Sequence, residues 1–325
     1  MINLAQHVLV IGGAAVDIQG FPDQHLRLYD SNPGKLKTSL GGVGRNIADN
    51  LSRLGVATKL ITTIGDDLYG KQILQEATLI NLDMRDSLIC PGRNTSTYLS
   101  MLNENGEMMA AISDMKLIDE LTIKYLKEKE ATINASSYLI LDTNLSLEVI
   151  DYVTSSYPHI PIILDTVSVA KAHKVKHLIG RFHTIKPNKY EAEVLTGIKI
   201  LDKKDLYLVA EQLLNKGVKQ LFISLGAEGL FYSNDEENGW LAPYDIHVVN
   251  TTGAGDAFVA AVTYGCMNQM TMNQIATFAQ AAAALVLSDE DTINPAFTVE
   301  NIKKILEDDE VEKSFRNESR SKRSD

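Results

Sequence analysis

Residues 138–226 contain four short apolar runs: YLILD (138–142), IPIILD (160–165), FHTIKP (182–187) and LFISLG (221–226). Segments with the spacing of amphipathic helices separate them. Such alternation is typical of a parallel sheet covered by helices on both faces. The sequence therefore predicts a doubly wound α/β fold.

The chain before these runs adds a strand, an irregular excursion and a helix. The run VLVIGGAAVD (8–17) reads as a buried strand that ends on glycine, and residues 19–40 lack helical period. The segment GGVGRNIADNLSRLG (41–55) places apolar residues at helical spacing and closes on Gly55. In STYLSMLNENGEMMAAIS (96–113), Asn105-Gly106 predicts a tight hairpin between two strands.

We therefore expect two structural units. An α/β domain would take residues 1–16, 43–90 and 117–313, with helices after residues 257, 271 and 299. A small β-sheet domain would take residues 17–42 and 91–116. The polar tail SFRNESRSKRSD (314–325) is expected to be disordered.

Composition limits the partners of the protein. With 31 Lys and Arg against 42 Asp and Glu, the 325 residues carry a formal net charge of −11, which disfavours nucleic acid and anionic membranes. An anionic ligand would need a local positive field from backbone amides, helix N-termini or a few basic side chains. Cys90 and Cys266 match no zinc or redox spacing, no run is long enough to span a membrane, and no cleavable leader is recognisable; we expect a cytoplasmic protein.

The segment NTTGAGDAF (250–258) precedes an apolar helix and predicts an anion cradle. Gly253, Ala254 and Gly255 would let consecutive amides point at one spot at a helix N-terminus. Asp256 could simply stabilise its own helix. Beside an anion site, however, a carboxylate is better explained as a base acting on the nucleophile that attacks the anion.

Two further junctions carry polar residues. In KPNKYEAEVLTG (186–197), Asn188 and Glu191 are hard oxygen donors suited to water-coordinated magnesium, or else an N-cap and its capping-box partner. The turn SLGAEG (224–229) would let a phosphate approach its amides, although ordinary β-turns look the same. At the other end, Asp17 with Gly41, Gly42 and Asn46 could hold a vicinal diol, or be turn and helix-surface residues.

Several known motifs are missing. The sequence has no Walker P-loop, no protein-kinase signature and no G-x-G-x-x-G after the first strand. His173 and His177 have metal-ligand spacing, but their lysine neighbours indicate a solvated helix face.

GGVGRN (41–46) and NTTGAGDAF (250–258) resemble the two signatures of the ribokinase, or phosphofructokinase B (PfkB), family of ATP-dependent sugar and nucleoside kinases. The order of the KPN..E and S.G..G elements matches as well, so the resemblance covers nearly the whole chain up to the tail. It implies a ribokinase-like fold, in which the α/β domain binds the nucleotide and carries out catalysis and the small β-sheet domain is a lid over the substrate. It also implies phosphoryl transfer from ATP with Mg²⁺.

The resemblance also implies roles for individual residues. Asp256 would be the base, with Gly253, Ala254 and Gly255 stabilising the transferred phosphoryl group. Asp17, Gly42 and Asn46 would hold the sugar hydroxyls, and Gly41 and Arg45 would belong to the same substrate site. ATP would lie along Asn188, Ser224, Gly226, Gly229 and Thr252, with Asn188 and Glu191 placing magnesium.

Within the family, SNPGK (31–35), GGVGRN, PGRNTSTYLS (91–100) and AISDM (111–115) resemble the substrate segments of members that phosphorylate pseudouridine. Arg45 stands where ribokinases commonly carry a small residue. The lid residues for a uracil edge would be drawn from Asn32, Lys35, Thr95, Ser96 and Tyr98, whose other interpretation is ordinary sheet and turn surface.

Three alternatives to pseudouridine phosphorylation stay open: phosphorylation of ribose or another nucleoside, a nucleoside-binding regulator without turnover, and a metal hydrolase built on the two histidines. Asn250 replaces an aspartate that often helps to bind a monovalent cation in the family, which predicts weak or absent potassium activation. Lid sheets in the family often pair between subunits, so the lid could support a homodimer.

Overall fold

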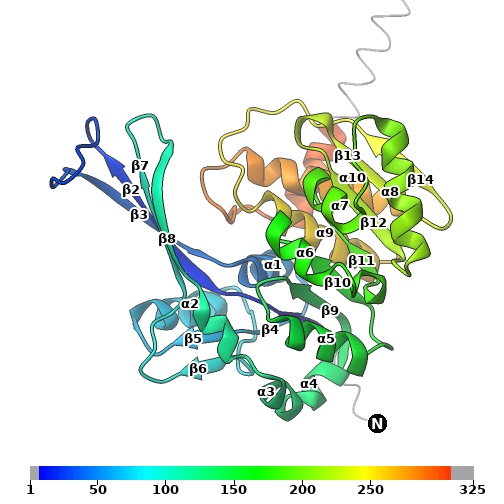
Figure 1. Ribbon diagram of the computed structural model, residues 1–325, viewed down its shortest axis with the longest axis horizontal. Helices are drawn as coiled ribbons and strands as arrows, with labels where there is room; N and C mark the ends of the chain where they lie inside the picture. The colour runs from blue at the N-terminus through cyan, green and yellow to red at the C-terminus, as the bar shows by residue number, and fades with distance from the viewer. Residues whose placement is uncertain (1–6, 309–325) are drawn as a thin grey trace, which may run out of the picture.

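The computed structural model describes residues 7–308, in which strands and helices alternate along most of the chain (Figure 1). The strands are β1 His7–Ile11, β2 Ala15–Pro22, β3 Gly34–Gly41, β4 Thr58–Ile61, β5 Thr63–Gly65, β6 Leu88–Cys90, β7 Thr97–Leu102, β8 Met108–Asp114, β9 Ser136–Asp142, β10 Ile162–Asp165, β11 Thr184–Ile185, β12 Gln220–Ser224, β13 Leu230–Asn234 and β14 Asn238–Leu241. The helices are α1 Val43–Arg53, α2 Leu68–Leu79, α3 Ile123–Glu128, α4 Glu130–Asn134, α5 Leu147–Ser156, α6 Val169–Val175, α7 Lys189–Thr196, α8 Lys203–Asn215, α9 Ala254–Met267 and α10 Met272–Leu287. Short 3₁₀ helices are η1 Lys116–Glu120, η2 Ile179–Arg181 and η3 Gly226–Glu228, and residues 299–308 are also helical.

The main sheet has the strand order β14-β13-β12-β11-β10-β9-β1-β4. From β4 to β12 all neighbours are parallel, as the four apolar runs predict. β13 and β14 are antiparallel additions that the sequence analysis missed. The connections from β12 to β13 and from β13 to β14 are a few residues long, and a parallel crossover needs about a dozen or more.

Side chains of alternate residues fill two cores on opposite faces of the sheet. Leu9, Leu139 and Leu221 belong to the core with α5, α7 and α8. Val10 and Ile140 belong to the core with α1, and Phe222 packs with α9 and α10. The period of two residues and the burial on both faces confirm the doubly wound fold.

A separate four-stranded sheet, in the order β3-β2-β7-β8, projects at one side of the α/β domain (Figure 1). It corresponds to the predicted lid and is called the lid sheet below. The hairpin predicted at Asn105-Gly106 joins β7 to β8, and Gly106 has a φ of 79°. The lid strands fall within residues 15–41 and 97–114, while the exact domain boundaries stay a prediction. The expected tail at 314–325 lies outside the described residues.

The strand order reverses at β1, which lies between β9 and β4. Ligands of open α/β sheets bind outside the carboxyl ends of the strands at such a switch point. There the chain passes through Gly12 and Gly13, whose backbone packs against Gly44 at the start of α1. The Gly13 amide donates to Asp142 at the end of β9, 2.8 Å away. The sheet therefore collects the polar residues described next at one edge.

Candidate active site

The predicted anion cradle lies at the N-terminus of α9. Gly253 is the N-cap, with a φ of 84°, and a Cβ there would meet the carbonyl oxygen of Thr292. Only glycine accommodates both conditions. The amides of Ala254, Gly255 and Asp256 follow in the first turn, where they have no partners within the helix and carry the positive end of its dipole.

Asp256 lies in that first turn and is 8% exposed. Its Oδ2 accepts a hydrogen bond from Asn46 Nδ2, 2.8 Å away on α1. Burial, and after it the nearby Asp165 carboxylate, raise the pKa of Asp256 to about 8, although the Asn46 hydrogen bond and Lys186 oppose the rise. A carboxyl group with a pKa in this range can take up a proton from an alcohol and release it near neutral pH.

Asn46 is in turn held by Arg45. The Arg45 guanidinium donates to Asn46 Oδ1 at 3.3 Å, to Leu40 O at 2.8 Å and to Asp49 at 2.5 Å. Arg45 is 7% exposed, and these hydrogen bonds hold Asn46 and the turn before α1 in place.

Asp17 lies on the face of the lid sheet that looks toward the α/β domain. A Cβ on Gly41 would collide with the Asp17 carboxylate, and one on Gly42 would meet the backbone of Gly13 and Ala14, so both glycines allow this close packing. Burial raises the pKa of Asp17, while Arg45 lowers it.

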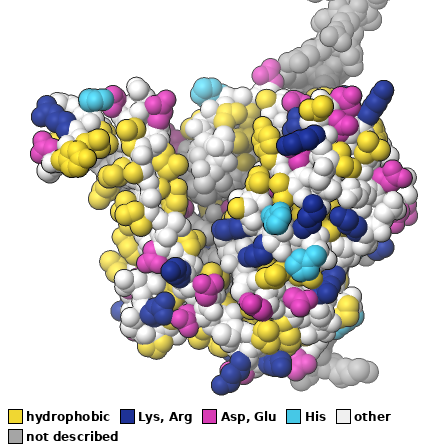
Figure 2. Space-filling model, viewed as in Figure 1, with side chains coloured by type: hydrophobic (Ala, Val, Ile, Leu, Met, Phe, Trp, Pro, Cys, Tyr) yellow, Lys and Arg dark blue, Asp and Glu magenta, His cyan; other side chains and the backbone are white. Residues whose placement is uncertain are grey.

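Lys37 lies on the same face of the lid sheet as Asp17, and its contacts show that this face points toward the α/β domain. Its Nζ donates to Glu290 O at 3.2 Å and pairs with Asp291 at 3.1 Å, both of which belong to the α/β domain. Figure 2 shows a hollow between the lid and this domain.

The register places a row of side chains across the inner face: Ser39, Asp17, Tyr98 and Ser113. Since paired residues point to the same side, Tyr98 joins Asp17 facing the hollow. Ser96, two residues earlier on the chain, is 3% exposed.

Other proposed lid residues lie apart from this row. Thr95 is occupied by Asp67, to which its hydroxyl donates at 2.6 Å, and by the Gly65 amide. Asn32 closes its own turn through Arg27, and Lys35 is exposed near the outer end of β3. The structure does not bring these three to Asp17.

Lys186, which the sequence analysis did not select, lies beside the cradle. Its Nζ is 3.0 Å from the position of a Cβ on Gly255, and the residue is 9% exposed. Its ion-pair partner, Asp165 Oδ2, is 3.8 Å away. A buried cation next to a positive helix end is unfavourable without an anion between them, which makes Lys186 a candidate phosphate ligand. The signal in the sequence was the lysine directly before Pro187-Asn188.

The two expected nucleotide segments meet at the ends of β11 and β12. Asn188 forms an isolated parallel bridge with Ser224, and the Ser224 amide donates to Pro187 O at 3.1 Å. Gly226 and Gly229 have φ values of 60° and 98°, and open space lies where a Cβ of Gly226 would stand. Thr252, exposed ahead of α9, donates its amide to Asn250 Oδ1 at 2.9 Å.

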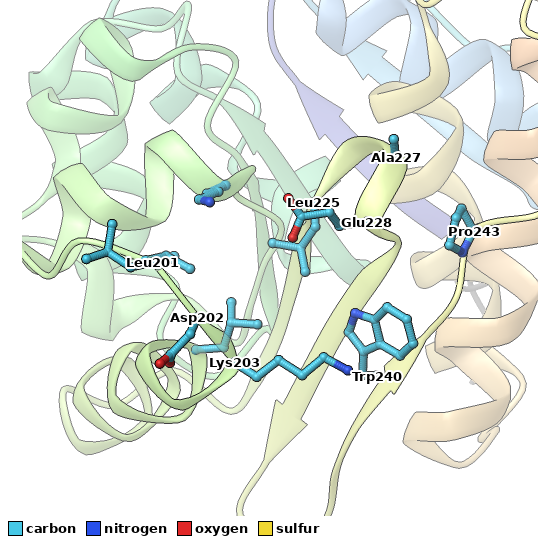
Figure 3. A pocket seen from close by; sticks show the side chains of 11 residues that line it. Leu201, Asp202, Lys203, Leu225, Ala227, Glu228, Trp240 and Pro243 are labelled. Atoms are coloured by element: carbon cyan, nitrogen blue, oxygen red, sulfur yellow. The ribbon is translucent and has the colours of Figure 1, made fainter.

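A cavity of about 420 Å³ borders the same turn through Leu225, Ala227 and Glu228 (Figure 3). Trp240 lines it, but the Lys203 ammonium lies 3.9 Å from the centre of the indole ring. This cation–π contact covers one aromatic face, which therefore is not free to stack on a base.

Asn188 and Glu191 form the capping box of α7. Glu191 Oε2 accepts from Asn188 N at 2.9 Å and Thr166 Oγ1 at 2.6 Å, and Oε1 accepts from Asn188 Nδ2 at 2.9 Å. Three of the about four lone pairs of the Glu191 carboxylate thus already accept hydrogen bonds. Contact with a water molecule bound to magnesium therefore fits this carboxylate better than direct coordination of the ion.

Within residues 7–308 no group of three or more His, Cys, Asp or Glu side chains could hold a metal ion, and this includes the surroundings of His173 and His177. In the same part of the chain, no helix is both long and apolar enough to cross a bilayer.

An α/β sheet with a smaller sheet beside it, and a helix N-terminus that carries a buried carboxylate, are the features of a phosphotransferase that acts on an alcohol. Residues 5–298 match the pfkB family of carbohydrate kinases, and the chain belongs to that family.

The chain is 37% identical to pseudouridine kinase from Escherichia coli over 94% of its own length and 97% of that protein. A solved structure of a candidate sugar kinase from Clostridium perfringens is 40% identical, with a TM-score of 0.87 over 93% of this chain and 96% of that one. Ribokinase from Arabidopsis thaliana, solved with ribose and ATP, has a TM-score of 0.81 at 21% identity, covers 93% of this chain and 99% of its own, and shares the fold.

Proposed function

We propose that the protein transfers the γ-phosphoryl group of ATP to the 5′-hydroxyl of pseudouridine, giving pseudouridine 5′-phosphate and ADP. The observation that carries the proposal is the buried Asp256 carboxylate, which lies in the first turn of α9 beside the N-terminal amides and accepts a hydrogen bond from Asn46. The similarity to an E. coli pseudouridine kinase supports the choice of acceptor.

In this reaction Asp17 and the Gly41-Gly42 backbone would hold the ribose diol, leaving the 5′-hydroxyl toward Asp256. The Asp256 carboxylate accepts the hydroxyl proton as O5′ attacks the γ-phosphorus. A new O5′–P bond forms, and the bond from phosphorus to the β,γ-bridging oxygen breaks with its electron pair leaving on ADP. Asn46 keeps the accepting oxygen in place throughout.

On the nucleotide side, the amides of α9 and the Lys186 ammonium would stabilise the negative charge of the transferred group. ATP would extend past Asn188 toward Ser224, Gly226 and Gly229. Bound Mg²⁺ would neutralise phosphate charge, with Asn188 and Glu191 orienting its waters. Closure of the lid, latched by Lys37 on Asp291, would exclude water as a competing acceptor.

A panel of acceptors tests the proposal. ADP release is measured with pseudouridine, uridine, adenosine and ribose at saturating MgATP. We expect the highest kcat/KM for pseudouridine. A preference for ribose or another nucleoside would mean that pseudouridine is not the acceptor. Nucleoside binding without any ADP release would instead indicate a nucleoside-binding regulator without turnover.

The rate should depend on the protonation of Asp256. Because burial and Asp165 raise its pKa to about 8, kcat/KM should fall about tenfold per pH unit on the acid side of that value. Asp165→Asn removes the repulsion and should move this acid limb to lower pH. The measurement is a pH–rate profile of both proteins; an unchanged limb in the variant would contradict the assignment.

Potassium should activate the protein little. The Asn250 amide donates to Glu290 O at 3.0 Å and its oxygen accepts from Thr252 N, so the side chain already bridges the segments that a cation would join. We propose that rates in potassium and in tetramethylammonium differ by less than about fivefold, the lower end of usual couplings. Asn250→Asp, tested in parallel, should increase the response, and a strong requirement in the wild type would refute this.

We further propose a homodimer through the lid. The face opposite Asp17 carries Leu36, Met101 and Ile112, which are 77%, 44% and 69% exposed, and all of β8 is exposed at the sheet edge. Apolar faces and open edges of this kind favour pairing. Light scattering should give a dimer mass, Ile112→Lys should halve it, and Leu201→Lys, at an 86% exposed site elsewhere, should not.

A further inference from the structure

A second cavity lies under the lid, next to the proposed sugar site. It measures about 220 Å³ and is lined by Gly13, Ala14, Asn144 and Lys171 from the α/β domain and by Ser96 and Ser113 from the lid. The volume is below the roughly 300–1,000 Å³ of sites that enclose a whole drug-sized ligand. It therefore suits one ring of a ligand whose remainder lies outside.

Contacts place this cavity at the end of the site remote from Asp256. Asp256 contacts Asn46, one helical turn after Gly42. Gly42 in turn packs on the backbone of Gly13 and Ala14, and the position of a Cβ on Gly13 is 3.2 Å from Asn144 Nδ2. A ligand that offers one end to Asp256 would thus offer its other end to Asn144.

The lid wall leads to the same conclusion. Ser113 pairs with Tyr98, which pairs with Asp17, so these three side chains share one face and one row. Ser113 therefore lies two strands away from Asp17, the carboxylate proposed to hold the ribose diol. Because neighbouring strands are about 4.8 Å apart, one nucleoside can reach from Asp17 into the cavity.

The polar groups of the cavity fit the edge of a heterocycle. Lys171 Nζ donates to Asn144 Oδ1 at 2.5 Å, which fixes the amide so that Nδ2 remains as a donor. The ammonium keeps further protons for a carbonyl oxygen, and the Ser96 and Ser113 hydroxyls can donate or accept. Met115 and Ile118 supply apolar surface beside them.

We propose that this cavity holds the base of the nucleoside, a pyrimidine ring with carbonyl oxygens and ring N–H groups, and that Lys171 and Asn144 select it over bare ribose. This inference rests on the proposed function, because it assumes that Asp17 and Asp256 bind the sugar. It assigns to Asn144, Lys171 and Ser113 a role in acceptor specificity.

The test compares pseudouridine with ribose in wild type, Lys171→Met and Ser113→Ala. Calorimetry gives Kd, and ADP release gives kcat/KM. Loss of a charged donor should weaken pseudouridine binding about 10- to 100-fold, and loss of the hydroxyl about threefold to tenfold. Neither change should affect ribose, and Lys171→Arg should recover part of the loss. Lys176→Met removes a lysine from the end of the same helix, at another cavity, and should change nothing.

The outcomes separate this inference from the proposed function. Equal losses for pseudouridine and ribose, or none for pseudouridine, would overturn the base site even if the protein is a kinase. A wild type that binds ribose alone would overturn it too. Selective loss of pseudouridine binding in a protein without turnover would support the base site while refuting the kinase.

Discussion

Asp256→Asn is expected to lower kcat by about 10²- to 10⁴-fold, the usual contribution of a general base, while KM for the nucleoside changes little. Asparagine has nearly the same shape, and its amide oxygen can still accept from Asn46 Nδ2. What it cannot do is take the proton of the acceptor hydroxyl. The measurement is ADP release at saturating ATP, with nucleoside affinity determined by calorimetry.

Asp165→Asn is the matched control for this variant. Asp165, the last residue of β10, is also buried, at 4% exposure, but it does not accept the proton of the hydroxyl in the proposed mechanism. It should retain kcat within about tenfold of wild type on the plateau of its pH profile. Equal losses in both variants would mean that kcat reports any change in buried charge, and full activity of Asp256→Asn would refute the mechanism.

Thermal unfolding tests whether misfolding of Asp256→Asn could cause the loss of rate. The pKa of Asp256 is higher in the folded protein than in the unfolded chain, so the stability that its proton provides is complete near pH 4 and lost as pH rises through about 8. Asparagine avoids this loss. The variant should therefore unfold at a higher temperature than wild type at pH 8, with the difference shrinking toward pH 4.

Local patterns predicted the elements that carry the site. The glycines before Asp256 indicated a helix N-terminus, and the structure adds the reason for Gly253: a close approach by Thr292, almost forty residues later. The helix after Gly42 and the hairpin at Asn105-Gly106 were likewise encoded within short segments. Such features depend on backbone conformation, which nearby residues determine.

What the sequence could not give depends on contacts between distant segments. Lys186 reads as the flank of a proline, and only the sheet brings its ammonium to Gly255. The sequence analysis predicts that Arg45 contacts the substrate, whereas in the folded protein its guanidinium donates to Leu40 O and Asp49. The Asn188 and Glu191 spacing allowed a cap or a magnesium site, and the structure forms the cap without removing the second role.

Lys186→Met should lower kcat by about 10²- to 10³-fold, the loss typical of removing one preorganised group from an anion site. Its ammonium, held beside Gly255, is a positive side chain buried against the amides of α9 in a protein whose net charge is −11. The charge of the phosphoryl group spreads over its oxygens in the transition state, so the effect should fall on kcat more than on KM.

The variant also affects the base, and the experiment must separate the two effects. Lys186 lowers the pKa of Asp256, so its removal should move the acid limb to higher pH. Comparing plateau rates removes this contribution. Lys186→Arg should keep part of the activity, and Lys189→Met, which removes a lysine at the start of α7, should keep all of it. If the whole loss of rate in Lys186→Met disappears at high pH, Lys186 acts only by lowering the pKa of Asp256. If a loss persists on the high-pH plateau, the Lys186 ammonium stabilises the transferred phosphoryl group directly.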